Sequence, residues 1–228
     1  MNVEPAELVA MLSKVKSGTI QDGLDELGLF HQSLPPTYRM MSPPKQREGF
    51  VGPARTLLFY MLEEPKVGPF ERSVKFWKFL EQYIKPGDVV VAGFEAEIPN
   101  CELVGGMLGT LYEQQGAAGW IGTYVRDLHE LHALNMGFIG MGCHPAIARG
   151  RIMLRSSEAP VTHGGVQIST GDYIVADSDG AVVIPARDGT LEKMYAFVAD
   201  YVPKEHAAKH DMDAGVLMSD VIDRHRIL

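Results

Sequence analysis

The chain has 228 residues, 46% of them hydrophobic, and a formal net charge of -8 at pH 7. This length supplies an ample core, and the acidic balance without a dense Lys/Arg run argues against nucleic acid or an anionic membrane as the main partner. No apolar run of about 18 residues and no signal-peptide pattern is found, so we expect a cytoplasmic location. Cys101 and Cys143 are too few for a disulfide framework, and we expect both to be buried free thiols.

Helix and strand signals alternate along the chain without a low-complexity linker. Apolar residues at helical spacing, such as Phe70, Val74, Trp77 and Leu80, mark the helices, while short apolar runs between turn residues mark the strands. A hairpin turned at 177–180 and a mostly helical tail over 188–228 follow. Helices are predicted over 4–15, 19–27, 70–84 and 100–115, strands over 50–60, 89–92, 118–122 and 138–141, and a loop over 33–48. This alternation is typical of an α/β protein.

The apolar run that starts at Gly119 ends in an adjacent pair, Arg126 and Asp127. A guanidinium binds a carboxylate in fork geometry, and one aspartate can hold Mg²⁺ or Mn²⁺ that keeps most of its waters. The pair therefore suits an oxo-acid and a divalent ion. A helix-start aspartate with a surface ion pair would explain the same two residues, so their context decides.

Five motifs follow one another along the chain: Gly52–Thr56, Pro86–Val91, Gly116–Gly119, Val125–Asp127 and Gly171–Pro185. In this order they resemble the motifs of the RraA-like family, which includes the regulator of ribonuclease activity A and the metal-dependent 4-hydroxy-4-methyl-2-oxoglutarate / 4-carboxy-4-hydroxy-2-oxoadipate aldolases. The resemblance implies a layered αββα sandwich similar to the phosphohistidine swivelling domain. It implies one domain over 1–228, with a core over about 19–187 and a helical extension over 188–228. It also implies homotrimers or hexamers with sites between subunits.

The resemblance further implies a reaction, cleavage of a 4-hydroxy-2-oxo acid to pyruvate or decarboxylation of oxaloacetate, aided by a divalent metal. Arg126 would hold the substrate carboxylate, Asp127 would bind Mg²⁺ or Mn²⁺, and Glu205 from a neighbouring subunit would reach the metal through water. A segment of backbone amides would face the substrate, namely Gly105, Gly106, Met107 and Leu108. A lysine Schiff base is the rival chemistry, although no lysine lies in an apolar run that would keep its amine neutral.

One acid of the aldolases is missing from this chain. Its position, about twenty residues before the Arg-Asp pair, falls on Gly105 or Gly106. Glu102 would share a helix face with these glycines, while Glu95 and Glu97 alternate onto one side of an extended run, so any of the three is a candidate replacement. The alternative is that all three are solvated surface acids.

Three histidines are weaker candidates. His129 and His132 could form a zinc or iron site with Asp127, or simply be solvated, and His144 lies in a loop where it could touch substrate. Two function classes remain: a metal-dependent lyase and a non-catalytic binding protein like the ribonuclease regulator. Asp127 and the helical tail favour the lyase.

Overall fold

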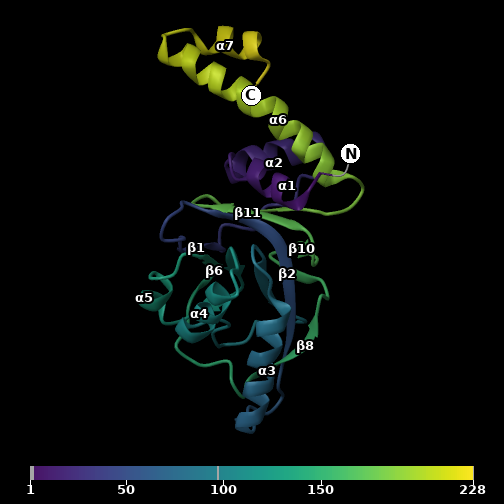
Figure 1. Ribbon diagram of the computed structural model, residues 1–228, viewed down its shortest axis with the longest axis vertical. Helices are drawn as coiled ribbons and strands as arrows, with labels where there is room; N and C mark the ends of the chain where they lie inside the picture. The colour runs from purple at the N-terminus through teal and green to yellow at the C-terminus, as the bar shows by residue number, and fades with distance from the viewer. Residues whose placement is uncertain (1–2, 97, 228) are drawn as a thin grey trace.

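A curled, mixed β-sheet forms the centre of the molecule in the computed structural model, which describes residues 3–96 and 98–227 (Figure 1). The strand order is β1-β6-β4-β3-β2-β11-β12, and β8 also pairs with β2. These strands are β1 (Arg39–Ser42), β2 (Phe50–Met61), β3 (Val89–Phe94), β4 (Gly119–Ile121), β6 (Gly137–Gly140), β8 (Ile152–Ser157), β11 (Tyr173–Asp177) and β12 (Gly180–Ile184).

Strand β2 organises the sheet because it pairs with three neighbours. Its first residues pair antiparallel with β11, its last residues pair antiparallel with β8, and β3 runs parallel along the other edge. Strands β2, β3, β4 and β6 are parallel, so their carboxyl ends meet at one edge. Ligand sites of α/β proteins commonly lie at such an edge, and the segment that leaves β4 carries the Arg126–Asp127 pair.

Helices cover the sheet in two groups. The first group, α1 (Pro5–Leu12), α2 (Ser17–Glu26) and α6 (Thr190–Asp213), packs on the β11–β12 hairpin through a buried cluster. The second group, α3 (Phe70–Tyr83) and α4 (Gly106–Gln114), packs on the parallel strands, with the short α5 (Leu128–Leu131) beside α4. The buried Asp177 joins hairpin and helix, because its carboxylate accepts hydrogen bonds from the Ser17 amide at 2.8 Å and the Ser17 hydroxyl at 2.7 Å.

The ring of Phe50 lies between two glycines on neighbouring strands. A Cβ atom at Gly119 or at Gly137 would overlap this ring. Phe50 is 2% exposed, so the ring has no room to move away. The absence of a side chain at these two glycines therefore makes room for the large Phe50 ring in the core.

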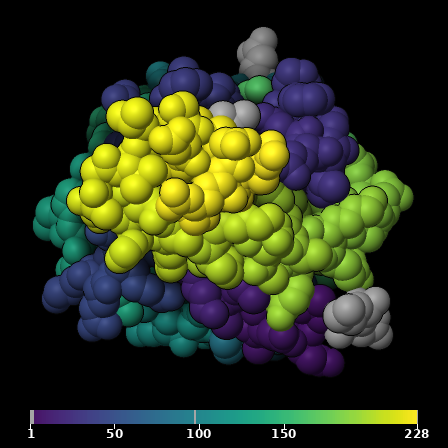
Figure 2. Space-filling model, turned by 90° about the horizontal axis from the view of Figure 1, so that it is seen from above, coloured from purple at the N-terminus to yellow at the C-terminus, as the bar shows by residue number. Residues whose placement is uncertain are grey.

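The C-terminal helices form an arm above the sheet. Helix α6 extends past α1 and α2, and α7 (Met218–His225) folds back against it (Figure 1). From above, the two helices form a ridge over this end of the molecule (Figure 2). Asp211 fastens the arm, with Arg224 Nη1 at 2.6 Å and His225 Nε2 at 2.8 Å from its Oδ2. Within the described residues, no helix is long and apolar enough to cross a membrane.

Most predicted elements are confirmed, three predictions are wrong in detail, and five further strands were not predicted. The helix predicted over 100–115 begins only at Gly106, because the residues before it form β-type bonds with distant segments. The loop predicted over 33–48 contains β1, which pairs with β6. Cys143 is exposed, whereas Cys101 is buried as expected. The strands that were not predicted are β5 (Tyr124–Val125), β7 (Gly142–Cys143), β8, β9 (Val161–His163) and β10 (Val166–Ile168).

Candidate metal and oxo-acid site

Three segments lie side by side and position the Arg126–Asp127 pair. They are residues 101–106, 124–127 and 142–148, and backbone hydrogen bonds of 2.9–3.0 Å join them. The second and third segments contain the two-residue strands β5 and β7, which pair with each other. The bonds run from the amides of Glu102, Leu103, Arg126 and His144 to the carbonyls of Ala146, Tyr124, Val104 and Val125, in that order.

Asp127 adopts a left-handed backbone conformation, with φ 51° and ψ 41°. Aspartate is one of the few residues that tolerate this region, and such outliers gather at functional sites. The turn directs the side chain back towards α4, where Asp127 Oδ2 accepts a hydrogen bond of 3.2 Å from the Gly106 amide. The carboxylate stays 38% exposed, so it remains available to a ligand.

Arg126 lies between two carboxylates. Its Nε is 3.3 Å from Asp127 Oδ2, and its Nη1 is 3.9 Å from Glu102 Oε1. Nε is buried and forms no aligned hydrogen bond, while the side chain as a whole is 31% exposed. The two acids therefore hold the guanidinium loosely and leave it free to bind an anionic ligand.

Glu102 is the buried member of this group. Its Oε1 accepts a 3.2 Å hydrogen bond from the Ala148 amide. Burial raises the pKa of Glu102 above its usual range, while the Ala148 bond and Arg126 oppose that shift. The prediction that Glu102 shares a helix face with the glycines is wrong, because residues 101–105 are not helical. The structure nevertheless brings Glu102 to the Arg126 guanidinium.

A pocket of about 360 Å³ opens beside these residues. Its lining residues come from two of the three segments and from the first residue of α5: Arg126, Asp127, Leu128, Cys143, His144 and Pro145. His144 Nδ1 lies 3.1 Å from the Ala146 amide, so the imidazole is oriented at the pocket edge. Contact between His144 and a substrate stays a prediction.

The predicted amide segment forms the first turn of α4. Gly105 is the residue before the helix, and a Cβ atom there would lie 2.9 Å from Asp127 Oδ2. Met107 is 74% exposed, whereas Leu108 packs against the core. Amides in the first turn of a helix have no carbonyl ahead of them and favour anions, so this end of α4 suits a carboxylate.

Asp127 fits a hard divalent ion better than it fits zinc. A partly exposed carboxylate with room beside it suits Mg²⁺ or Mn²⁺, which keep several waters. A zinc site needs three or four protein ligands, and the described residues contain no group of three or more His, Cys, Asp or Glu side chains that could hold a metal. The predicted alternative of an Asp127–His129–His132 site is therefore wrong. His129 is 84% exposed, and His132 Nε2 lies 3.1 Å from the Met41 carbonyl.

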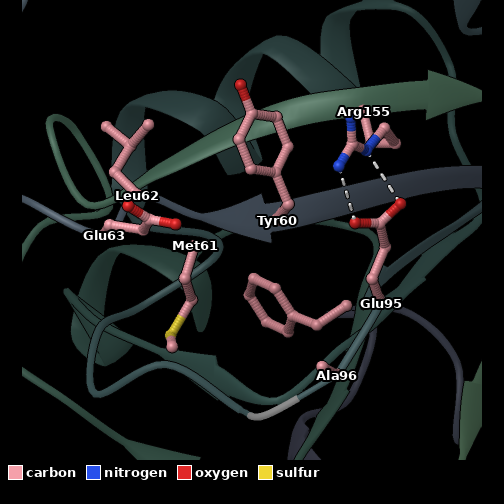
Figure 3. Close-up of a pocket in the computed structure, with 8 residues that line it drawn as sticks. Tyr60, Met61, Leu62, Glu63, Glu95, Ala96 and Arg155 are labelled. Atoms are coloured by element: carbon pink, nitrogen blue, oxygen red, sulfur yellow. Dashed lines mark hydrogen bonds and ion pairs between the residues drawn. The ribbon is translucent and has the colours of Figure 1, made fainter.

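Two further acids lie elsewhere. Glu95 forms two hydrogen bonds with Arg155, of 2.8 and 3.1 Å, in a second pocket of about 660 Å³ where the guanidinium also covers the Tyr60 ring (Figure 3). This pairing makes Glu95 a poor replacement for the missing acid, and Glu97 lies outside the described residues. Glu205 is on α6, where its Oε1 binds Lys209 Nζ at 2.7 Å. Within one chain α6 lies beyond the β11–β12 hairpin, away from α5 at the side of the sheet (Figure 1).

Sequence reasoning missed Glu130. Its carboxylate lies at the start of α4, in the space that a side chain on Gly106 would enter. The only signal in the sequence is a glutamate three residues after Asp127 combined with a glycine where an acid was expected. Neither feature indicates this contact without the packing of α5 against α4.

The fold and the site together define an α/β protein with a carboxylate and a guanidinium at the end of a parallel strand. The chain belongs to the RraA-like family, since the family model described as Aldolase/RraA matches residues 17–183.

Its relatives are proteins named "Putative 4-hydroxy-4-methyl-2-oxoglutarate aldolase". The protein of Burkholderia multivorans is 36% identical over 152 residues, which cover 64% of this chain and 85% of the relative. That of Burkholderia mallei is 35% identical over 161 residues, which cover 68% and 88%. A third, from Deinococcus radiodurans, is 40% identical over 88 residues, or 38% of this chain and 54% of the relative, so that match spans about half of it.

Solved structures agree on the fold. RraAS2 of Streptomyces coelicolor, described as an unusual member of the RNase ES inhibitor RraA protein family, has a TM-score of 0.73 at 26% identity, covering 92% of this chain and 98% of that one. An uncharacterized Pseudomonas syringae protein has a TM-score of 0.78 at 18% identity, covering 97% and 99%, which shows the fold alone. The predicted α/β class is confirmed, while the likeness to a phosphohistidine swivelling domain stays a prediction.

Proposed function

We propose that this protein is a divalent-metal-dependent lyase acting on a 2-oxo acid. The favoured reaction is retro-aldol cleavage of a 4-hydroxy-2-oxo dicarboxylic or tricarboxylic acid to pyruvate and a second oxo-acid, and decarboxylation of oxaloacetate to pyruvate and carbon dioxide follows from the same enolate chemistry. One observation carries the proposal: Arg126 and Asp127, adjacent in the chain, both line the 360 Å³ pocket. The aldolase names of the relatives support it.

Arg126 and the first turn of α4 bind the substrate in this proposal. The exposed part of the guanidinium takes a carboxylate of the oxo-acid, and the α4 amides take a second oxygen. Glu102, buried behind Arg126, holds the guanidinium in place. Carbon–carbon cleavage leaves a pyruvate enolate, and the fixed positive charge of Arg126 lowers the barrier because it stands near the developing negative charge.

Asp127 would hold the divalent ion, Mg²⁺ or Mn²⁺. The ion would supply Lewis-acid polarisation of the 2-oxo group. The contribution of the chain is the left-handed turn at Asp127, which fixes the carboxylate against the Gly106 amide before any ligand arrives. Because the Asp127 carboxylate is already in position, it needs little reorganisation when the metal and the substrate bind.

A pyruvate-release assay tests the proposal. The purified protein is given a panel of 4-hydroxy-2-oxo acids and oxaloacetate, with Mg²⁺, with Mn²⁺ and with excess EDTA. We expect release from at least one substrate and its loss in EDTA. No release from any substrate, or full activity in EDTA, contradicts the proposal.

Non-catalytic binding is the second candidate, favoured by the likeness to RraAS2 over 92% of this chain. A binding protein needs neither Arg126 nor a metal, so comparing the unchanged protein with Arg126→Ala distinguishes the two candidate functions. Substrate-dependent pyruvate release that disappears in Arg126→Ala supports the lyase. Ribonuclease inhibition that persists in Arg126→Ala supports the regulator.

We also propose a homotrimer or a dimer of trimers. The α6–α7 arm carries exposed apolar side chains, including Leu217 at 69% and Met218 at 52%, which a neighbouring subunit could cover. Such an assembly would bring Glu205 towards the Asp127 site of another subunit. Light scattering at micromolar concentration gives the mass, and a monomer contradicts this part of the proposal.

A further inference from the structure

His144 and Arg126 lie next to each other at the end of a small parallel strand pair. Strands β5 and β7 pair with Val125 opposite Cys143, so the next residue of each strand, Arg126 and His144, follows in register. The amide of His144 donates a 2.9 Å hydrogen bond to the Val125 carbonyl, which continues the pairing. Neighbouring strands lie about 4.8 Å apart, and the two side chains therefore leave the backbone side by side.

The ring of Tyr124 shows which face His144 occupies. Side chains two residues apart in a strand point to the same face, so Tyr124 and Arg126 share one. The ring centroids of Tyr124 and His144 are 5.8 Å apart, and the rings are inclined by 46°. The imidazole therefore stands on the Arg126 face, and both side chains line the pocket of about 360 Å³.

The hydrogen bond at Nδ1 fixes where the His144 imidazole carries its hydrogen. The Ala146 amide, 3.1 Å from Nδ1, can only donate, so Nδ1 is the acceptor. An imidazole whose Nδ1 accepts a hydrogen bond is neutral and has its hydrogen on Nε2. Within the described part of the chain, Nε2 meets no protein acceptor. His144 therefore offers the pocket an unused hydrogen-bond donor without adding a positive charge.

The rest of the pocket wall offers no second donor of this kind. Among the described residues that line it, Arg126 is the only cation. Apart from His144, the others are a carboxylate, two apolar side chains and a weakly donating thiol. A ligand with two separate carboxylates therefore finds Arg126 for one of them and His144 for the other.

The order of the three segments sets the direction in which such a ligand lies. The middle segment bonds to residues 103–104 on one edge, through the Tyr124 carbonyl and the Arg126 amide. On its other edge it bonds to β7, through the Val125 carbonyl. The start of α4 follows on the first side, and His144 lies on the second. A ligand anchored by Arg126 and the α4 amides therefore has His144 on its far side.

We propose that His144 Nε2 donates a hydrogen bond to the carboxylate on the second fragment of the substrate, the part beyond the bond that is cleaved. This inference rests on the lyase of the proposed function and assigns a residue to the second carboxylate, which that function leaves without one. His144 is then a specificity-determining residue. It distinguishes a dicarboxylate from a monocarboxylate and takes no part in breaking the bond.

Ligand binding tests this role without turnover. Isothermal titration calorimetry in Mg²⁺ measures pyruvate, which ends before the second fragment, and 2-oxoglutarate, which carries a second carboxylate but no 4-hydroxyl group. His144→Phe keeps a ring against Tyr124 but has no donor, whereas His144→Gln keeps an N–H near the position of Nε2. His31→Ala is the control, because His31 is an exposed histidine in the loop after α2.

We expect the unchanged protein to bind 2-oxoglutarate more tightly than pyruvate. His144→Phe should weaken binding of 2-oxoglutarate roughly 10–100-fold, the range for a lost hydrogen bond to a charged group, and leave binding of pyruvate nearly unchanged. His144→Gln should keep most of the affinity for 2-oxoglutarate, and His31→Ala should keep all of it.

The outcomes separate this inference from the function on which it rests. Pyruvate binding that is lost in Arg126→Ala, alongside equal 2-oxoglutarate affinities in the unchanged protein and His144→Phe, overturns the role of His144 and leaves the lyase standing. An equal loss for both ligands in His144→Phe also overturns that role, because the residue would then only support the pocket. Absence of pyruvate binding to the unchanged protein, together with no pyruvate release from any substrate, overturns both.

Discussion

Glu102 Oε1 lies 3.9 Å from Arg126 Nη1, so a buried carboxylate stands behind the guanidinium that faces the pocket. This pair links the stability of the protein to the orientation of the arginine that we propose binds the substrate. Removing the charge of Glu102 therefore has two separable consequences, one for unfolding and one for binding.

The first prediction concerns pH. Burial raises the pKa of Glu102 above its ordinary 4.5. In the pH range between the pKa of the unfolded chain and the higher pKa of the folded protein, the folded protein therefore binds more protons than the unfolded chain. The contribution of Glu102 to stability must then fall as pH rises through that window. Glu102→Gln lacks this titration, and we expect its free energy of unfolding relative to wild type to improve as the pH rises above 4.5 in urea titrations. If the free energies of unfolding of Glu102→Gln and wild type change in parallel with pH, this prediction is contradicted.

The second prediction concerns Asp127. Asp127→Asn keeps the size of the side chain and tolerates the left-handed turn, but loses the charge a divalent ion requires. We expect loss of saturable Mn²⁺ binding and of pyruvate release, with a melting temperature close to wild type. Asp127→Ala should behave alike with about 1 kcal/mol of added destabilisation from the turn. Full activity in either variant would show that Asp127 holds no metal.

The third prediction concerns Arg126. Arg126→Lys keeps the positive charge but loses the planar fork, so kcat/KM should fall roughly 10–100-fold. Arg155→Lys is the matched control, because Arg155 also pairs with a glutamate but does so in the other pocket. Equal turnover in the two variants would mean that Arg126 only stabilises the fold.

The fourth prediction concerns Glu205. In the proposed assembly Glu205→Gln lowers activity with little change in oligomer mass. Asp200→Asn is the control, since Asp200 forms the same type of pair with Lys204, at 2.6 Å, on the same helix. Steady-state kinetics and light scattering on both variants decide it, and indistinguishable kinetics would remove Glu205 from the site.

The fifth prediction concerns the core. Gly137→Ala places a methyl group against the buried Phe50 ring, and overpacking of this kind typically costs about 1–3 kcal/mol. Urea unfolding should show that loss. Gly142→Ala on β7 is the control, because a Cβ atom there meets nothing within 4 Å. Similar losses in both variants would argue against the ring contact.

Elements with strong local periodicity could be predicted from the sequence, and elements held by distant partners could not. Helix α3 follows from its apolar spacing, and the hairpin from its turn residues. The late start of α4 could not, because residues 102–104 bond to segments more than twenty residues away. Arg126 and Asp127 were identified from their adjacency and the family resemblance, whereas Glu130 depends on how closely α5 approaches α4.

The left-handed turn at residue 127 restricts which amino acids this position can accept during evolution. Glutamate offers the same oxygen ligands as aspartate, yet its longer side chain gives no local support to a left-handed backbone. Asparagine accepts the turn but lacks the charge. Aspartate is therefore favoured where a chain keeps both the turn and a metal ligand, so a lineage that abandons metal chemistry has an easy first step to asparagine or glycine.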